Sequence, residues 1–223
     1  MEDLDALDQL RLKKSNLLLL GITGGLASGK TTVSNMLWEL GGGPIIEFDR
    51  IARQVVEPGK PAWKEIVDYF GRQVLQEDDN LDRKKLSNIV FWDQEKRKRL
   101  EGFTHPRIYE ECVRQVKEIA ERIPGAIIQV VIPLLIELTL QSRFDKLVVV
   151  YIPEALQIKR LVDREGITET EAENMLKSQI PIDEKVRYAD YVIHNESSLD
   201  DTKKQVKELW MELNIFQKEK ERS

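Results

Sequence analysis

A glycine-rich loop between an apolar strand and a helix is the feature that most constrains the fold of this chain. The stretch LLLLGITGGLASGKTTVSNML runs from Leu17 to Leu37, and Gly24–Thr31 within it fit the pattern G-x-x-x-x-G-K-[ST] in full. A loop that wraps phosphates with its N–H groups needs glycine where side chains would collide or where φ is positive. The helix that follows adds free N–H groups and a dipole that favour an anion. This context predicts a nucleoside triphosphate site.

The residues of the loop have specific expected roles. Lys30 is expected to reach the β- and γ-phosphates, and Thr31 to offer its hydroxyl group to Mg²⁺. The sequence therefore predicts ATP as the phosphoryl donor and Mg²⁺ as its companion ion. The residues predicted to bind the nucleotide are Gly25, Leu26, Ala27, Ser28, Gly29, Lys30, Thr31 and Thr32.

Short apolar runs alternate with helical patterns along the rest of the chain. Nearly unbroken apolar or β-branched runs are typical of strands covered on both faces, and their alternation with helices predicts a parallel sheet. We expect an α/β fold, a P-loop NTPase-like three-layer sandwich with a five-stranded parallel sheet. The strands are expected at Leu17–Ile22, Pro44–Phe48, Ala126–Ile132, Lys146–Tyr151 and Tyr191–His194, and the helices at Lys30–Leu40, Arg83–Trp92, Pro106–Arg122, Glu154–Arg164, Glu169–Gln179 and Leu199–Leu213.

Two segments depart from this alternation. About 75 residues separate the second and third strands, far more than a βαβ crossover needs. The additional residues, roughly Gly59–Gly102, are predicted to form a helical substrate lobe. The polar helical stretch Asp163–Glu184 predicts a lid, and Thr168 and Glu171 form a capping-box pattern within it. A lobe and a lid are expected where a reaction is shielded from water. The alternative is that both segments are ordinary surface helices. We expect an N-terminal extension at 1–14, the main domain at 15–215 and a charged tail at 216–223.

Charge and composition narrow the class of protein. The 223 residues carry a net charge of −5 with both signs interspersed, so there is no basic stripe for nucleic acid. The N-terminal MEDLDALDQL is acidic where a signal peptide is basic, and the apolar run before the loop is too short for a membrane span. The single cysteine, Cys112, is expected to be a small core residue. We expect a cytoplasmic protein without nucleic-acid or membrane partners, monomeric or weakly homo-oligomeric.

Further motifs follow the glycine-rich loop in a fixed order: ARQVVEPG, LDR, HPRI, PLL-E and AD-VI-N. With GITGGLASGKTTVS, this series resembles the dephospho-CoA kinase family over about Leu18–Val206. The resemblance implies ATP-dependent phosphorylation of the ribose 3′-hydroxyl of dephospho-CoA, a small-molecule substrate, to give coenzyme A in the final step of its biosynthesis. Two positions depart from the family pattern: this chain has Ala27 where the family usually has glycine, and Glu47 where the family usually has aspartate.

Asp49 follows the second expected strand and so lies at the edge of the sheet where open α/β folds bind ligands. A carboxylate there can accept a proton from an attacking hydroxyl, hold that hydroxyl in line, or bind Mg²⁺. The resemblance implies the first role, with contact to the substrate. The alternative is a helix N-cap for a segment that begins at Arg50. No aspartate ends the third strand, so Asp49 or water would complete the metal shell.

Several arginines are candidates for the reaction. Arg160 and Arg164 are four residues apart and share one helix face, where arginine can stabilise the charge of a moving phosphoryl group. On sequence alone a salt-bridged surface helix explains them better, and the resemblance implies catalysis, more firmly for Arg164. Glu137 is expected to anchor an arginine. The predicted catalytic residues are thus Asp49, Lys30, Arg164 and Arg160. The predicted substrate contacts are Asp49, Arg53, Asp82, Arg83 and His105. For His105 a purely structural role is an equal alternative, because it precedes Pro106, which can begin a helix.

Other functions are weighed against this one. A guanine-nucleotide switch usually carries an N-K-x-D motif, which the sequence lacks, and its D-x-x-G match at Asp163–Gly166 ends a helical segment rather than a strand. A regulator that holds ATP without turnover and another P-loop small-molecule or nucleotide kinase remain as alternatives.

Overall fold

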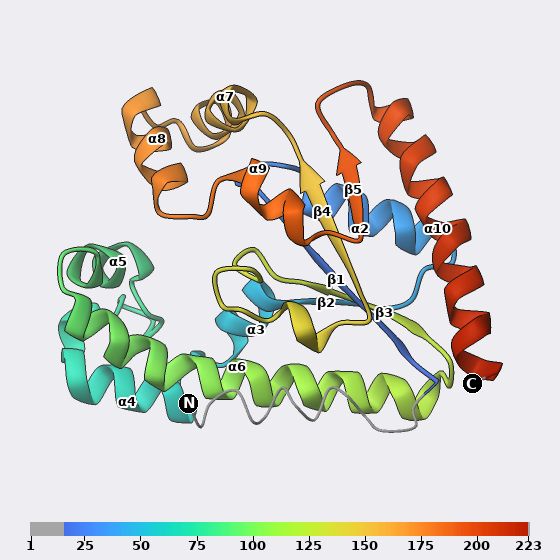
Figure 1. Ribbon diagram of the computed structural model, residues 1–223. Coiled ribbons are helices and arrows are strands. Elements are labelled where there is room, and N and C mark those ends of the chain that lie inside the picture. Colours follow the sequence, from blue (N-terminus) through green and yellow to red (C-terminus); the bar gives the residue numbers. More distant parts are fainter. Residues whose placement is uncertain (1–15, 223) are drawn as a thin grey trace. The chain divides into compact units, whose positions relative to one another are not determined.

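Figure 1 shows the computed structural model, in which residues 16–222 are described and a five-stranded parallel sheet carries the glycine-rich loop. The strand order is β2-β3-β1-β4-β5, so β1 is the central strand, and the chain crosses from β3 on one side of it to β4 on the other. Ligands of such sheets bind at the carboxyl ends of the strands where this reversal occurs. The strands are β1 (Leu18–Gly24), β2 (Ile45–Glu47), β3 (Ile127–Val131), β4 (Lys146–Tyr151) and β5 (Tyr191–His194).

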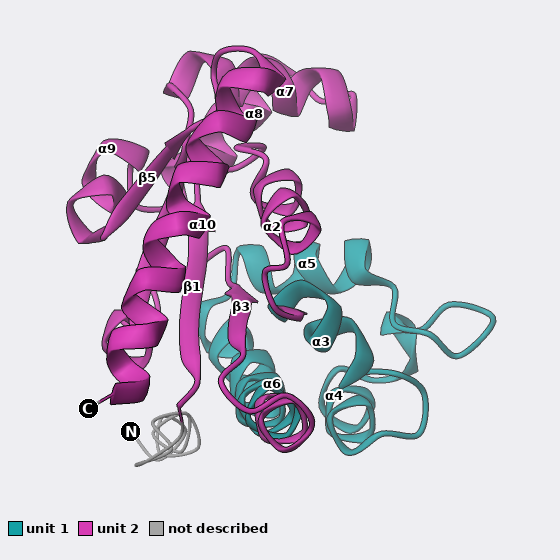
Figure 2. Cartoon of the chain, turned by 90° about the vertical axis from the view of Figure 1, so that its right-hand side faces the viewer, with its two compact units in different colours: residues 1–10, 48–115 teal, residues 11–47, 116–223 magenta. Residues whose placement is uncertain are grey.

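The described residues fall into two units, which Figure 2 distinguishes by colour. The helical unit consists of Phe48–Gln115, and the sheet unit of residues 16–47 and 116–222. The predicted N-terminal extension at 1–14 lies outside the described residues. The helices are α2 (Lys30–Glu39), α3 (Phe48–Gln54), α4 (Pro61–Phe70), α5 (Arg83–Phe91), α6 (Gln94–Arg122), α7 (Glu154–Glu165), α8 (Glu169–Lys177), α9 (Ile182–Lys185) and α10 (Leu199–Arg222), with 3-10 turns at η2 (Arg72–Val74), η3 (Gln141–Arg143) and η4 (Val186–Tyr188).

The expected α/β architecture with five parallel strands is confirmed, and its core explains why the strands are so apolar. On one face of the sheet, alternate residues of β1 (Leu18, Leu20 and Ile22) are fully buried against α2 and α10. Burying each large apolar side chain stabilises the fold by about 1.5–3 kcal/mol. On the other face, a Cβ atom at Gly21 would lie 2.9 Å from the Phe144 ring. The segment between β3 and β4 therefore packs directly on the centre of the sheet.

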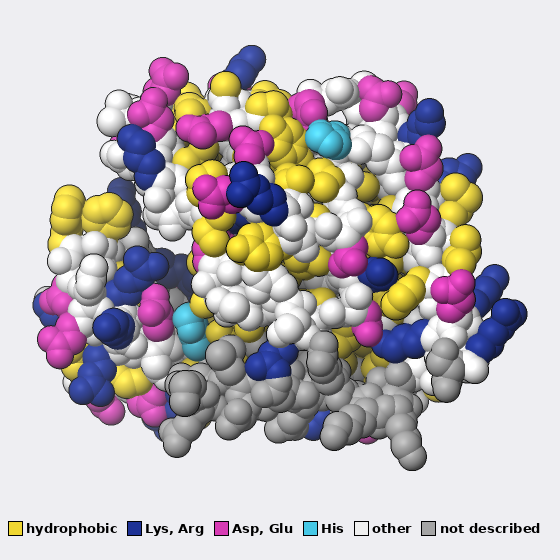
Figure 3. All heavy atoms as spheres, viewed as in Figure 1, with side chains coloured by type: hydrophobic (Ala, Val, Ile, Leu, Met, Phe, Trp, Pro, Cys, Tyr) yellow, Lys and Arg dark blue, Asp and Glu magenta, His cyan; other side chains and the backbone are white. Residues whose placement is uncertain are grey.

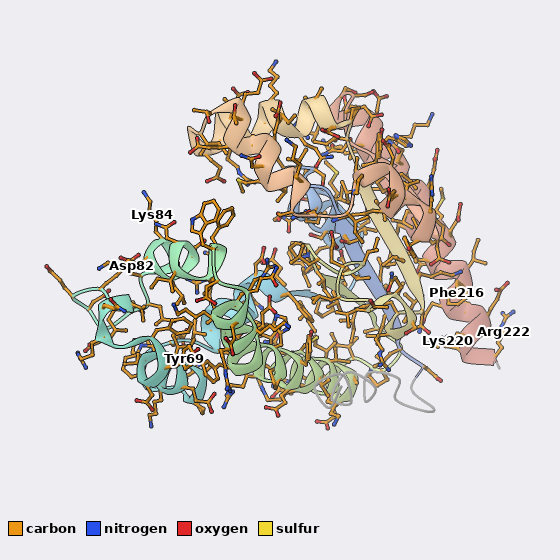
Figure 4. All side chains as sticks on the ribbon, turned by 60° about the vertical axis from the view of Figure 1, so that its left-hand side comes forward. Tyr69, Asp82, Lys84, Phe216, Lys220 and Arg222 are labelled. Carbon is orange, nitrogen blue, oxygen red and sulfur yellow. The ribbon has the colours of Figure 1, made fainter. Side chains whose placement is uncertain are left out.

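The last helix is longer than the sequence predicts. We expect it to end at Leu213, but α10 continues to Arg222 and includes residues 216–222 of the predicted tail. The Lys220 ammonium donates to the Leu17 carbonyl at 2.5 Å and lies 2.7 Å from Asp145 Oδ1, at the start of the sheet (Figure 4). Beyond Leu213 the helix is held by both apolar and polar contacts, since Phe216 packs against the core and Lys220 bonds to the start of the sheet.

The helical unit also differs from the prediction at one helix start. We expect Pro106 to begin a helix, but α6 begins at Gln94 and passes through it. Asp93 Oδ1 accepts the N–H groups of Lys96 and Glu95 at 3.0 and 3.1 Å and so caps the true start. Proline removes only one hydrogen bond of the helix interior, and the buried residues that follow it keep the helix intact.

The surface of the molecule is charged and mixed. On the face shown in Figure 3, acidic and basic side chains are interspersed, as expected for a chain with a net charge of −5. Within residues 16–222, no helix is both long enough and apolar enough to cross a membrane.

Candidate active site

The loop between β1 and α2 packs so closely against neighbouring segments that three of its glycines have no room for a side chain. At Gly24 a Cβ atom would lie 2.3 Å from the Val150 carbonyl oxygen, and at Gly25 it would lie 2.2 Å from the Gln157 amide. Gly29 has a φ of 91°, in the left-handed region that favours glycine. The glycines therefore let the loop pack tightly against β4 and α7, and its binding of an anion stays a prediction.

Lys30 and the two threonines begin α2 at the end of this loop. Lys30 Nζ donates to the Gly25 carbonyl at 2.9 Å and lies 3.4 Å from the Gly24 carbonyl, so the ammonium group rests against the loop. Thr31 and Thr32 are exposed in the first turn of α2. Their hydroxyl groups and the N-terminus of the helix suit a phosphate with its metal ion. Among residues 16–222, no cluster of three or more His, Cys, Asp or Glu side chains could hold a metal.

Ala27 is the one loop residue for which the backbone is costly. Its φ is 52°, in the left-handed region that costs a residue with a Cβ atom about 1–2 kcal/mol. This strain accounts for the glycine that the family pattern usually has at the position. The torsion is an allowed one, and the loop remains intact around it.

A set of three polar residues, which we call the polar clamp, holds the outer side of the loop. Asn195 Nδ2, just after β5, donates to the Ser28 carbonyl at 2.7 Å, and Thr202 Oγ1 in α10 donates to Asn195 Oδ1 at 2.9 Å. Arg160 in α7 donates to the Asn195 carbonyl at 2.9 Å and to the Ala27 carbonyl at 3.5 Å. The structure thus places Arg160 against the loop, and its predicted catalytic role stays a prediction. Sequence reasoning missed Asn195 and Thr202 as site residues.

The predicted lid, Asp163–Glu184, contains the last residues of α7, all of α8 and most of α9. Gly166, with a φ of 67°, ends α7, so the D-x-x-G match lies at a helix end and not after a strand. The predicted capping box at Thr168 and Glu171 is confirmed. Arg164 is largely exposed in the last turn of α7, and its Nε atom donates to Glu165 at 2.7 Å. Its side chain is available to a ligand rather than packed into the fold.

The segment that follows α8, at the end of the predicted lid, is held by a buried ion pair. Lys185 is fully buried, and its ammonium lies 2.7 Å from Glu137 Oε1 and 3.2 Å from Gln179 Oε1. The same Glu137 oxygen accepts the N–H of Ile180 at 3.0 Å. The expectation that Glu137 anchors an arginine is wrong, because its partner is a lysine. A pocket of about 290 Å³ lies beside this segment and is lined by Gly25, Glu154, Gln157, Leu176, Lys177, Gln179, Ile180, Pro181 and Ile182.

In the helical unit, Asp49 belongs to a charged group with two arginines. Asp49 lies in the first turn of α3, which begins at Phe48, so it does not precede the helix as an N-cap would. The negative charge of its carboxylate there interacts favourably with the positive end of the helix dipole. Burial lowers the pKa of Arg83, the neighbouring charge of Arg53 lowers it further, and Asp49 partly restores it. Arg53 and Arg83 line a pocket of about 290 Å³, where their repulsion would be relieved by an anion.

The other predicted substrate contacts have structural partners of their own. Asp82 Oδ1 accepts the Lys85 N–H at 2.9 Å and caps α5, whose start is labelled in Figure 4. His105 lies within α6, half-buried, with its ring centroid 5.8 Å from that of Tyr109. Cys112 is fully buried in the same helix, and burial raises the pKa of its thiol to about 12. Cys112 is therefore a core residue, as expected.

The fold and the loop together define a class of protein. A parallel α/β sheet whose central strand ends in a G-x-x-x-x-G-K-[ST] loop, followed by a helix, is the architecture of P-loop phosphotransferases.

Comparison with known proteins then identifies the family. The family model for dephospho-CoA kinase matches residues 18–201, and the chain belongs to this family. It is 43% identical over 189 residues to the dephospho-CoA kinase of Carboxydothermus hydrogenoformans, covering 84% of this chain and 90% of that protein. It is 44% identical over 200 residues to the enzyme of Bacillus anthracis, covering 89% and 98%.

Solved structures agree with this membership. A Thermus thermophilus crystal structure superposes with a TM-score of 0.73 at 29% identity, covering 88% of this chain and 97% of that one. The dephospho-CoA kinase of Campylobacter jejuni superposes with a TM-score of 0.60 at 30% identity, covering 89% and 98%. The resemblance inferred from the motifs is confirmed.

Proposed function

We propose that this chain transfers the γ-phosphoryl group of ATP to the ribose 3′-hydroxyl of dephospho-CoA, the step that yields coenzyme A. The observation that carries the proposal is the loop of the sheet unit, where Gly24, Gly25 and Gly29 pack too closely against neighbouring protein atoms to bear side chains. This is the glycine placement that the G-x-x-x-x-G-K-[ST] pattern uses to bind phosphates. We propose that the reaction takes place in the cytoplasm, with a monomer or a weak homo-oligomer as the working species.

The donor side of the reaction is assigned to the sheet unit. The loop N–H groups and Lys30 would hold the β- and γ-phosphates, with Lys30 leaving the Gly25 carbonyl to do so. The Thr31 hydroxyl would be the protein ligand of Mg²⁺. Bound with the nucleotide, Mg²⁺ would neutralise charge on the β- and γ-oxygens. Arg160 holds the loop itself in this structure, which gives it a supporting part in donor binding.

The chemical step is assigned to Asp49 and Arg164. The substrate 3′-oxygen forms a bond to the γ-phosphorus while the bond to the β,γ-bridging oxygen breaks, and ADP leaves with that electron pair. The Asp49 carboxylate would accept the hydroxyl proton and pass it to water. Arg164, exposed at the end of α7, would stabilise the negative charge of the moving phosphoryl group.

The substrate is assigned to the helical unit. Dephospho-CoA carries a diphosphate group, and the pocket of Arg53 and Arg83 offers two cations whose mutual repulsion an anion would relieve. Asp82 fixes the start of α5, which carries Arg83, and we propose that it acts on the substrate mainly through this position. His105 is proposed to orient the substrate from α6.

A panel of acceptors tests the function directly. With ATP and Mg²⁺, the purified chain should phosphorylate dephospho-CoA much faster than nucleoside monophosphates or pantothenate derivatives, with ADP release as the readout. A preference for another acceptor would support a different small-molecule kinase. Tight ATP binding without any turnover would support a regulator, and a preference for guanine nucleotides would support a switch.

Substitution of Asp49 tests whether its carboxylate acts as the catalytic base or only stabilises helix α3. Asp49→Asn keeps the shape of the side chain, so the melting temperature and the affinity for ATP should stay nearly unchanged while turnover falls about 100-fold or more. Asp49→Ala should lose as much rate and at most about 1 kcal/mol of stability, because the residue interacts with the dipole of α3 rather than capping it. Wild-type turnover by Asp49→Asn would remove the residue from the chemical step.

A further inference from the structure

The polar clamp makes one backbone carbonyl of the loop an anchor point. The Ser28 carbonyl accepts the amide of Asn195 across 167 residues of sequence, and the Asn195 amide accepts in turn from Thr202 Oγ1. Both bonds are buried. Burying an amide is costly unless both ends are bonded, and here each end has a partner. A satisfied, buried network of this kind rigidifies what it holds.

The geometry of the peptide bond carries the effect to the other side of the loop. The C=O and N–H of one trans peptide point in opposite directions within one plane. The Ser28 carbonyl and the Gly29 N–H belong to the same peptide. Because Asn195 holds the carbonyl at 2.7 Å, the Gly29 N–H is aimed away from Asn195. Gly29 immediately precedes Lys30 and the first turn of α2, so this N–H belongs to the anion-binding end of that helix.

The side chain of Asn195 also fills the space that would otherwise belong to a residue at position 29. A Cβ atom there would lie 2.3 Å from Asn195 Nδ2. The strand itself does not need this side chain, because the Asn195 backbone N–H donates to the Tyr151 carbonyl at 2.9 Å. The side chain therefore acts on the loop, and the backbone acts on the sheet.

We propose that Asn195, supported by Thr202, is a positioning residue for ATP: it fixes the peptide between Ser28 and Gly29 so that the Gly29 N–H faces the phosphates before the nucleotide arrives. The inference rests on the proposed function only in taking ATP as the ligand of the loop. It assigns donor affinity to two residues, one after β5 and one in α10, that lie outside the motif.

The test compares two variants that each remove a buried side-chain amide bonded to a backbone carbonyl. Asn195→Leu removes the bond to Ser28 and keeps the approximate shape. The matched control is Gln129→Met in β3, whose buried amide donates to the Gly43 carbonyl at 3.2 Å, far along the chain from the loop. Both variants should lose thermal stability. Calorimetric titration with a non-hydrolysable ATP analogue and Mg²⁺, without acceptor and below both melting temperatures, measures the donor affinity.

The two variants should differ in donor affinity. Asn195→Leu should raise the dissociation constant for the ATP analogue about 10-fold or more, the effect of misplacing one N–H that bonds a charged phosphate. Gln129→Met should change it less than about 3-fold. Thr202→Val should fall between them, because Asn195 then keeps its bond to Ser28 but loses its own support.

Two outcomes would overturn the inference. They are wild-type affinity in Asn195→Leu, and an equal loss of affinity in Gln129→Met, which would show a general effect of lost stability. Since the titration contains no acceptor, its result does not depend on dephospho-CoA being the substrate. A wild-type chain that binds the ATP analogue but phosphorylates no dephospho-CoA would overturn the proposed function and leave the inference standing. A wild-type chain that binds no ATP analogue would overturn both.

Discussion

Glu137 neutralises a lysine that has no contact with water, so its charge can be removed with a measurable effect. The Lys185 side chain is 0% exposed and that of Glu137 is 17% exposed. In Glu137→Gln the new amide oxygen can still accept the Ile180 N–H that Glu137 accepts now. The substitution therefore removes the charge while keeping the volume and the backbone contact. What remains is a buried ammonium whose other bonded partner is the neutral Gln179 oxygen.

The distance between the two charges sets the size of the effect. At 2.7 Å and an effective dielectric constant of about 20, the Coulomb attraction is roughly 6 kcal/mol. The cost of removing both ions from water offsets much of this attraction. Breaking a buried pair on one side usually costs about 3–5 kcal/mol. We expect about 3 kcal/mol for Glu137→Gln, because the amide still offers a dipole to Lys185. For a chain of this size that corresponds to a fall in melting temperature of roughly 6–12 °C.

Urea unfolding at neutral pH measures this change, and a double variant supplies the control. Lys185→Met combined with Glu137→Leu replaces both ions by apolar groups of similar size. The free energy lost by the double variant should be smaller than the sum of the two single losses, because no unpaired charge remains. A loss below about 0.5 kcal/mol in Glu137→Gln would refute the reasoning, since it would mean that Lys185 reaches water or another acceptor.

Other variants test the loop, the lid and the buried thiol. Ala27→Gly should raise the free energy of unfolding by up to about 1 kcal/mol by relieving the φ of 52°, and a destabilised variant would contradict this. Arg164→Ala should lower kcat more than it raises the KM for dephospho-CoA, whereas an effect on KM alone would make it a substrate anchor. Above the ordinary thiol pKa of 9.0, the unfolded chain ionises Cys112 before the native chain does, because burial raises the native pKa to about 12. Wild-type stability should then fall by up to about 1.4 kcal/mol per pH unit relative to Cys112→Ala, and equal pH slopes would exclude this.

The sheet was predictable because its signals are local. Lys146–Tyr151 and Tyr191–His194 are strands over the residues that the apolar runs predict. Lys146–Tyr151 is buried at its four inner residues, and a strand covered on both faces must be apolar at nearly every position, so it can be recognised from the sequence. The capping box at Thr168 was predictable for the same reason, since its two partners are three residues apart.

Helix ends were harder to predict because tertiary contacts decide them. The local preference of proline for the first helical position suggests a start at Pro106, but the Asp93 cap starts the helix at Gln94, and the buried residues after Pro106, Cys112 among them, hold its second half. The end of α10 depends on Lys220 and Gln217, which donate to carbonyl groups near the start of β1 and before β3. Nothing in their sequence neighbourhood indicates these acceptors. A charged run such as QKEKER looks the same whether it is a loose tail or a docked helix.

In the candidate site, too, some features follow from local sequence and others from contacts with distant residues. The pattern G-x-x-x-x-G-K-[ST] is local, but the atoms that forbid side chains within it come from distant residues. The Val150 carbonyl lies against Gly24, the Gln157 amide against Gly25 and the Asn195 amide against Gly29. Asn195 closes the AD-VI-N motif, so that motif is physically part of the loop. A substitution at such a partner should therefore alter ATP binding as one within the loop does, even where the G-x-x-x-x-G-K-[ST] residues are unchanged.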